Sequence, residues 1–146
     1  MTRADSRAAL ARVRALAADA PFVRWLGVEV VNAGQGWVET ELLLTPNHLQ
    51  QTGVVHAGVQ ATLADNTAGA AATTVIDDAQ TVVSVEFKLN LLRGARGNKL
   101  RCRSEVLKSG RRIVVAESAV MVEAEQGPRL VSKATVTLMP VRAARE

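Results

Sequence analysis

The sequence predicts an α+β domain in which an antiparallel sheet of about six strands wraps around one long central helix. Several segments alternate between apolar and polar residues, which is the period of a half-buried strand. Only one segment, 56–74, is long, dense in alanine and glycine, and free of proline. An antiparallel sheet has one apolar face to cover, and this segment is the element available to cover it.

The chain opens on a predicted amphipathic helix. Segment 4–19 carries apolar residues at a spacing of three, which are Leu10, Val13 and Leu16. Pro21 closes the pattern, because proline cannot continue a helix. We therefore assign residues 1–20 to an N-terminal helix.

The strands are bounded by turn residues. Turns are predicted at 32–35, at Ser109 with Gly110, and at Gln126 with Gly127, and an irregular loop at 47–53. The tail 142–146 is expected to fray. The predicted strands are 27–31, 36–45, 81–92, 99–108, 112–123 and 129–141.

Strand 81–92 has the clearest alternation. One predicted face holds Val83, Val85, Phe87, Leu89 and Leu91, and the other holds Ser84, Glu86, Lys88 and Asn90. The order is then helix, two strands, long helix, and four strands in a meander. A curved sheet wrapped around one helix is the hot-dog fold.

Composition limits the alternatives. The 146 residues are 48% hydrophobic, which suits one core, so 1–146 is expected to be a single domain. Cys102 is the only cysteine, which excludes an internal disulfide and fits a reducing, cytoplasmic compartment. The arginine-rich segment 1–20 resembles neither a signal peptide nor a membrane span.

Positive charge is concentrated in one block. Nine Lys or Arg residues and one acid, Glu105, lie from Lys88 to Arg112, so this block carries a charge of +8, whereas the net charge of the whole chain is +4. The rest of the chain therefore carries −4. Such a block indicates an anionic partner, either a nucleic-acid backbone or a phosphorylated small molecule.

Asp65 is the main catalytic candidate. At about 100° per residue, one stripe of the long helix holds Val59, Leu63, Asn66 and Ala70. Asp65 shares another stripe with small residues, which are Gly58, Ala61, Thr62, Ala68, Gly69 and Ala72. Small residues let another backbone or a ligand approach a carboxylate closely. The alternative is a solvent-facing aspartate.

The start of this helix supplies a second candidate group. His56 lies nine residues before Asp65, hence on the opposite face and about 13 Å away. If both serve one site, they must come from two subunits of a symmetric dimer. The Ala57 N–H at the helix start can hold the oxyanion of a thioester reaction. Simple capping is the alternative for this helix end.

Other catalytic types find little support. His48 and His56 are the only histidines, and no Cys or acidic cluster around them has metal-ligand spacing, so no metal is predicted. A Ser-His-Asp triad lacks its Gly-x-Ser-x-Gly elbow. We expect His56 to shape the helix start rather than to act as a base.

Several spaced motifs resemble one known family. They are Gly53-Val-Val-His-Ala-Gly-Val, Leu63-Ala-Asp, Val83-Ser-Val-Glu-Phe-Lys-Leu-Asn and Gly110-Arg-Arg. Together they resemble the PaaI-like, or phenylacetic-acid-degradation, branch of the hot-dog thioesterases over residues 22–140. The resemblance implies dimers that pair into tetramers. It also implies hydrolysis of acyl-CoA without a cofactor, because coenzyme A is part of the substrate.

The resemblance also assigns residues. It implies that Asp65 is the general base or nucleophile, that Gln50 orients substrate or water, and that Ser84 holds the attacking water. His56 and Ala57 match the oxyanion region. Two departures are Gln at position 50 where Asn is commoner, and His-Ala-Gly in place of His-Gly-Gly; Ala57 keeps its N–H in either case.

The basic block then has a possible partner in the phosphates of coenzyme A. The candidates near turns are Arg93, Arg96, Lys108, Arg111 and Arg112. The alternative is a solvated basic edge that discourages strand pairing. No nucleic-acid or membrane partner is predicted.

Two other functions remain open from sequence. An acyl-thioester hydratase or dehydratase would pair His56 with Asp65 across the interface. A non-catalytic acyl-CoA or nucleic-acid binding module would use the basic block, although aromatics and nucleic-acid motifs are scarce.

Overall fold

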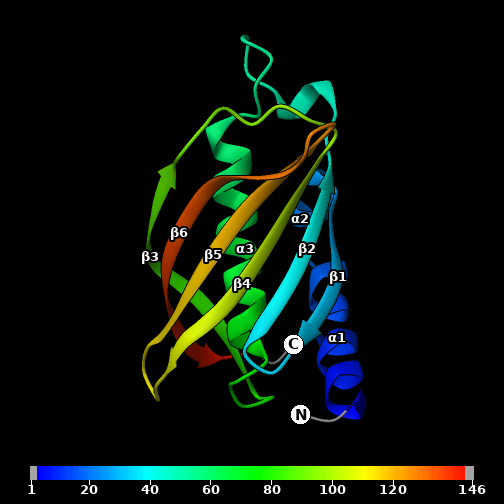
Figure 1. The fold of residues 1–146 in the computed structure, drawn as a ribbon. Helices are drawn as coiled ribbons and strands as arrows, with labels where there is room; N and C mark the ends of the chain where they lie inside the picture. Colours follow the sequence, from blue (N-terminus) through cyan, green and yellow to red (C-terminus); the bar gives the residue numbers. More distant parts are fainter. Residues whose placement is uncertain (1–2, 144–146) are drawn as a thin grey trace.

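The structure is a computed structural model that describes residues 3–143. It contains six strands in one antiparallel sheet and a long helix packed across one face, so the predicted α+β hot-dog architecture is confirmed (Figure 1). The helices are α1 (Arg3–Ala18), α2 (Pro21–Leu26), η1 (Pro46–His48) and α3 (Ala57–Thr73). The strands are β1 (Val28–Gly34), β2 (Trp37–Leu43), β3 (Gln80–Leu91), β4 (Lys99–Ser109), β5 (Val114–Ala124) and β6 (Gly127–Arg142).

The short helix α2 was not predicted. Pro21 ends the α1 pattern as expected, but it also sits in the first turn of α2, where a missing N–H costs nothing. Gly27 ends α2 in the left-handed region at φ 89°, and its N–H donates to Arg24 O and Val23 O. The helix α2 therefore forms a second, short helical segment directly after α1.

The sheet order is β1-β2-β4-β5-β6-β3, so the predicted meander of the last four strands is wrong for β3. β2 already pairs along one side of β4, and β5 takes the other side. β3 instead pairs with β6 at the far edge of the sheet. The segment after β3 crosses the end of the sheet to reach β4 (Figure 1).

A bulge in β3 overturns the predicted division of its faces. Ser84 pairs with Leu138 and Glu86 pairs with Thr137, which leaves Val85 as an extra residue. Residues directly opposite each other share a face. Ser84 therefore points inward with buried Leu138, while Val83 points outward. Beyond the bulge the inward residues are Phe87, Leu89 and Leu91.

The buried face of α3 also differs from the predicted stripes. Leu63 is fully buried as expected, but Asn66 is only half-buried, whereas Ala68 and Ala72 are buried. The half-exposed face of α3 instead holds Ala61, Thr62, Asp65 and Gly69. Asp65 thus lies among small residues, as predicted, on a narrower stripe. Across residues 3–143, no helix is both long and apolar enough to cross a membrane.

Candidate active site

The structure brings Asp65 and Ser84 together. The Ser84 hydroxyl donates to Asp65 Oδ1 at 2.6 Å. Strict alternation along β3 from the inward Phe87 and Leu89 would turn Ser84 outward. The bulge at Val85 shifts this alternation by one residue, which makes the contact possible. Asp65 Oδ2 has no hydrogen-bond partner among residues 3–143 and remains able to accept from water.

Buried polar contacts fix the position of α3, and with it Asp65, against the sheet. Ser118 Oγ of β5 donates to the carbonyl of Ala64 at 2.8 Å. The hydroxyls of Thr40 and Thr67 are 2.7 Å apart in the core, one on β2 and the other on α3. These contacts set both the rotation and the translation of α3, so the adjacent carboxylate has a defined place.

Asp65 opens into a pocket of about 380 Å³ between three elements, which we call the Asp65 pocket. Its walls include Asp65 and Gly69 of α3, Leu16 and Ala17 of α1, and Val82 and Ser84 of β3. Its polar lining residues are Asp65, Asn66, Thr73, Thr81 and Ser84, and the remaining lining residues are apolar. The sequence did not identify Leu16 or Ala17 as site residues, because their spacing indicated only a packing face.

His56 is the N-cap of α3, in agreement with its predicted role in shaping the helix start. Its Nδ1 accepts from the Gly58 N–H at 2.9 Å. A Cβ added at Gly58 would lie 3.0 Å from that nitrogen, so the small residue protects the cap. The Ala57 N–H has no acceptor within residues 3–143. It is therefore available to a ligand at the positive end of the helix.

The structure keeps His56 apart from Asp65 within one chain, as the helical spacing predicted. As a cap, His56 does not follow the helical period, and it lines a second pocket of about 650 Å³ together with Gly58 and Thr62. Gly58, Thr62 and Asp65 share one stripe of α3. His56 and Asp65 nevertheless border different pockets and make no contact with each other. The second pocket, which we call the α2 pocket, also exposes Phe22 and Trp25, two of the four aromatic residues.

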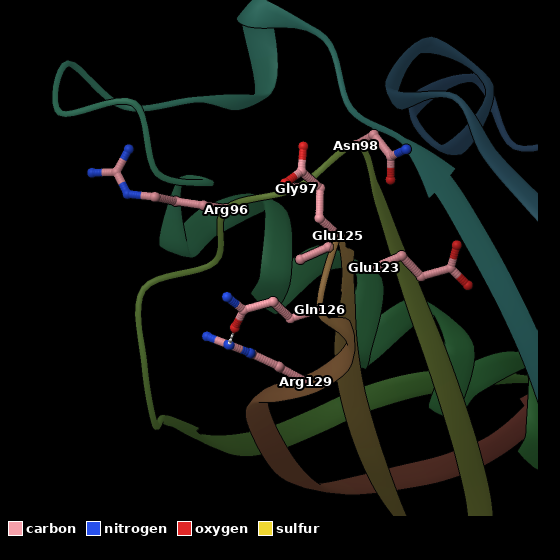
Figure 2. A pocket seen from close by; sticks show the side chains of 8 residues that line it. Arg96, Gly97, Asn98, Glu123, Glu125, Gln126 and Arg129 are labelled. Carbon is pink, nitrogen blue, oxygen red and sulfur yellow. Dashed lines mark hydrogen bonds between the residues drawn. The ribbon is translucent and has the colours of Figure 1, made fainter.

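Gln50 lies in a tight turn before α3. Its Nε2 donates to Thr52 Oγ1 at 2.7 Å, and the turn is closed by Gln50 N–H to Val54 O. Arg96 holds the same turn, because its guanidinium donates to Thr52 O at 2.9 Å and to Gly53 O at 3.1 Å. In Figure 2, Arg96 extends toward this turn, away from Glu123 and Arg129.

The basic block of the sequence does not form one patch. Arg93 and Arg96 lie in the segment that connects β3 to β4, and each donates to backbone carbonyls. Lys108, Arg111 and Arg112 lie at the β4–β5 hairpin, about 30 Å away along β4. These three side chains are exposed and make no ion pair within residues 3–143.

The middle of the block is neutralised on the outer face of the sheet. Lys99 and Arg101 pair with Glu41 and Glu123, and Arg103 pairs with Glu39. Burial opposes ionisation of Glu41, but hydrogen bonds from Arg101 and Lys99 outweigh it and lower the pKa of this carboxyl. A continuous basic track for a nucleic-acid backbone is therefore absent from the described residues.

The remaining histidine and the cysteine are structural. His48 Nδ1 accepts from Thr45 N–H at 3.1 Å, so its Nε2 donates to Leu26 O at 3.0 Å. Cys102 is buried, and burial raises the pKa of its thiol to about 11. Within residues 3–143, no group of three or more His, Cys, Asp or Glu side chains is placed to hold a metal ion.

Comparison with known proteins identifies the family. The family model described as "Thioesterase superfamily" matches residues 52–128, which include the Gln50 turn from Thr52 onward, α3 and β3. The chain belongs to the thioesterase superfamily. One relative, a putative esterase of Halobacterium salinarum, is 31% identical over 131 residues, covering 86% of this chain and 85% of the relative.

Solved structures of other proteins have the same fold. A thioesterase family protein from Silicibacter pomeroyi aligns with a TM-score of 0.89 and 31% identity, over 92% of this chain and 99% of that protein. The PaaI protein of E. coli aligns with a TM-score of 0.82 over 96% of each chain, at 17% identity. The latter likeness concerns the fold alone.

Proposed function

We propose that this protein is an acyl-CoA thioesterase, which hydrolyses an acyl-CoA thioester to a free acid and CoA at a site shared by two subunits. The observation that carries this proposal is the Ser84–Asp65 hydrogen bond at the mouth of a mainly aliphatic pocket, in a chain of the thioesterase superfamily. The spaced motifs favour the PaaI-like branch within it, and with that branch a tetramer made of two dimers.

Asp65 is the group that drives hydrolysis. Ser84 holds Oδ1, which leaves Oδ2 free to accept a proton from water. The water oxygen forms a bond to the thioester carbonyl carbon while its proton moves to Asp65. When the tetrahedral intermediate collapses, the C–S bond breaks and the thiolate takes up that proton, which yields free acid and CoA. Direct attack by Oδ2, with later hydrolysis of the anhydride, uses the same geometry.

The oxyanion needs a donor that Asp65 does not have beside it. The Ala57 N–H is a free donor at the start of the same helix, but it lies eight residues, or about 12 Å, from Asp65. A symmetric partner with an antiparallel α3 would bring its own Ala57 to this carboxylate. The small residues along the Gly58, Thr62 and Asp65 stripe permit that approach. Gln50, beside the helix start, would then help to orient the substrate.

The open edge of β3 supports such a dimer. No strand among residues 3–143 pairs with its outer side, and its exposed apolar side chains include Val83, Val85 and Phe87. A long apolar edge of this kind is a surface for pairing with another strand. Pairing with the same edge of a second copy gives a closed two-fold dimer.

The β4–β5 hairpin is the preferred site for the CoA phosphates. Val114 pairs with Leu138, which pairs with Ser84, so the base of the hairpin is two strands, or about 10 Å, from the Asp65 pocket. Its exposed cations Lys108, Arg111 and Arg112 are not engaged elsewhere. Arg93 and Arg96 are candidates with weaker support, because both already bind backbone carbonyls.

Thiol release from a panel of acyl-CoA esters tests the activity. We expect wild-type protein to release free CoA, and Asp65→Asn to lower kcat by about 10²- to 10⁴-fold with an unchanged oligomer. Ser84→Ala should lose less, about tenfold, because Asp65 remains. Hydration of enoyl-CoA without thiol release, or full activity in Asp65→Asn, would contradict the proposal.

A truncated substrate tests the hairpin separately. The Arg111→Glu, Arg112→Glu double variant should raise KM for an acyl-CoA at least about tenfold. It should leave the N-acetylcysteamine thioester of the same acid unaffected, because that substrate lacks the phosphates. The matched control is Arg129→Glu, which removes an exposed arginine that lines a different pocket. Equal effects on both substrates would reject the hairpin as the phosphate site.

A further inference from the structure

We infer that the Asp65 pocket takes the acyl group as a straight aliphatic chain of medium length, and that Leu16 of α1 sets the length that it accepts. This inference rests on the proposed thioesterase function, and it adds the substrate class and a specificity residue. It is carried by the shape and lining of the pocket between α1, α3 and β3.

The pocket is elongated along α3. Its α3 residues run from Asp65 to Thr73, which is about 12 Å of helix, and facing them are Val13, Leu16 and Ala17 of α1 and Ala20 just after it. An extended chain advances about 1.2 Å per bond, judging from the three backbone bonds of a residue, so this length fits about ten bonds. Thr73 and Thr81 line the end farthest from Asp65, so the apolar part of the lining ends there.

The lining is apolar in the middle of this axis, between the polar residues at its two ends. The reacting end has Asp65 and Ser84, and beyond it come Val82 and Gly69. A Cβ added at Gly69 would meet Val82 and Leu138 at 3.8 and 4.0 Å, which is ordinary contact. Packing therefore does not require glycine at position 69. The missing side chain instead makes the groove deeper. The exposed aromatic pair Phe22 and Trp25 lies in the α2 pocket instead.

Leu16 is placed to measure the chain. It is 47% exposed although it lines the pocket, so an apolar ligand would cover side-chain area that water now contacts. One helical turn earlier, Val13 is 1% exposed and is packed into the core with Val30 and Ala71. The wall that carries Leu16 is thus anchored, and a larger or smaller side chain at 16 would change the groove and not the helix position.

The test compares two opposite substitutions at one position. Leu16→Trp should shift the preferred acyl length down, with kcat/KM for decanoyl-CoA falling at least about tenfold relative to butyryl-CoA. Leu16→Ala should shift the preference toward longer chains. Ala15→Trp is the matched control, because Ala15 is exposed on the same helix and does not line the pocket.

Wild-type protein should also prefer octanoyl-CoA to phenylacetyl-CoA. Chain-length profiles that are identical in wild type and both Leu16 variants would overturn the inference while leaving the thioesterase activity intact. A preference for the aryl ester would do the same. A change of oligomer mass in Leu16→Trp with an unchanged profile would mean that a second copy, not the acyl chain, covers the groove. Absence of thiol release from every ester by wild type would instead reject the proposed function itself, and with it this inference.

Discussion

The β1 edge of the sheet is covered by the chain itself, whereas the β3 edge is not (Figure 1). At β1, α1 packs alongside, Val13 joins Val30 in the core, and Arg14 Nε donates to the edge carbonyl of Val30 at 3.0 Å. At β3, apolar side chains such as Val83 (44% exposed) and Phe87 (45% exposed) meet solvent.

The same two edges border the Asp65 pocket from opposite sides. α1, packed on β1, supplies one wall, and β3 supplies the other through Val82 and Ser84. The covered edge is thus completed within one chain, and the open edge is where, under the proposed function, a second chain would supply the oxyanion donor. Stability and activity should respond differently to changes at the two edges.

The largest effect is expected at β3. Lysine at both Val83 and Phe87 should prevent edge pairing, because charges on an edge strand oppose it. We expect a monomer by sedimentation equilibrium and thiol release reduced about 100-fold, since the shared oxyanion donor is lost. Glu29→Lys, at an exposed side chain of β1, is the control on the other edge, and it should change neither property. Full activity in a monomeric variant would contradict the proposal that the site needs a second chain at the β3 edge.

A core change at β1 should affect stability instead. Val13→Ala removes two buried methyl groups from the junction of α1 with β1. We expect a loss of about 2 kcal/mol in the free energy of unfolding, measured with urea. The oligomer mass should not change, and a shift to monomer would show that α1 also supports the other edge.

Arg14→Ala should have a smaller effect of the same kind. It leaves the Val30 carbonyl without its side-chain donor, which should cost about 1 kcal/mol in the free energy of unfolding. Arg14→Lys can restore the donor in part. An unchanged unfolding midpoint would mean that water replaces Arg14 at this edge.

The smallest effect is expected on the outer face, away from both edges. The pKa of Glu41 is lowered from 4.5 by its ion pairs, so its contribution is present at neutral pH and is lost as the pH falls below that value. Because the pair is near the surface, the loss should be no more than about 0.5 kcal/mol. Glu41→Gln should flatten the acid side of the stability profile. A steeper acid decline in Glu41→Gln would contradict the sign.

Sequence patterns predicted the architecture because periodicity reports which faces are buried. Segment 56–74 and the alternating strands corresponded to α3 and the sheet, with element ends moved by a few residues. The position of β3 beside β6 depended on β2 already occupying β4, which no local pattern contains. The bulge at Val85 interrupts the period of β3 without an interrupting glycine, so the two faces were assigned wrongly.

The candidate site was predicted in part. The helix stripe and its motif identified Asp65, the resemblance to the family identified Ser84, and the structure adds the hydrogen bond between them. The basic block appeared as one feature because charges were counted along the chain, but β4 separates its ends and Glu41 neutralises its middle. Leu16 was missed because a pocket wall and a core face have the same helical spacing.

Mixing two inactive variants tests the shared site most directly. Asp65→Ala removes the carboxylate, and Ala57→Pro removes only the helix-start N–H, because proline is tolerated at this first position and His56 already has the extended ψ of 139° that precedes proline. Ala57→Gly, which keeps the N–H, is the control. When the two variants are co-expressed, each mixed dimer contains one intact site, so we predict recovery of about a quarter of wild-type activity. No recovery from dimers shown to be mixed would mean that each chain builds its site alone.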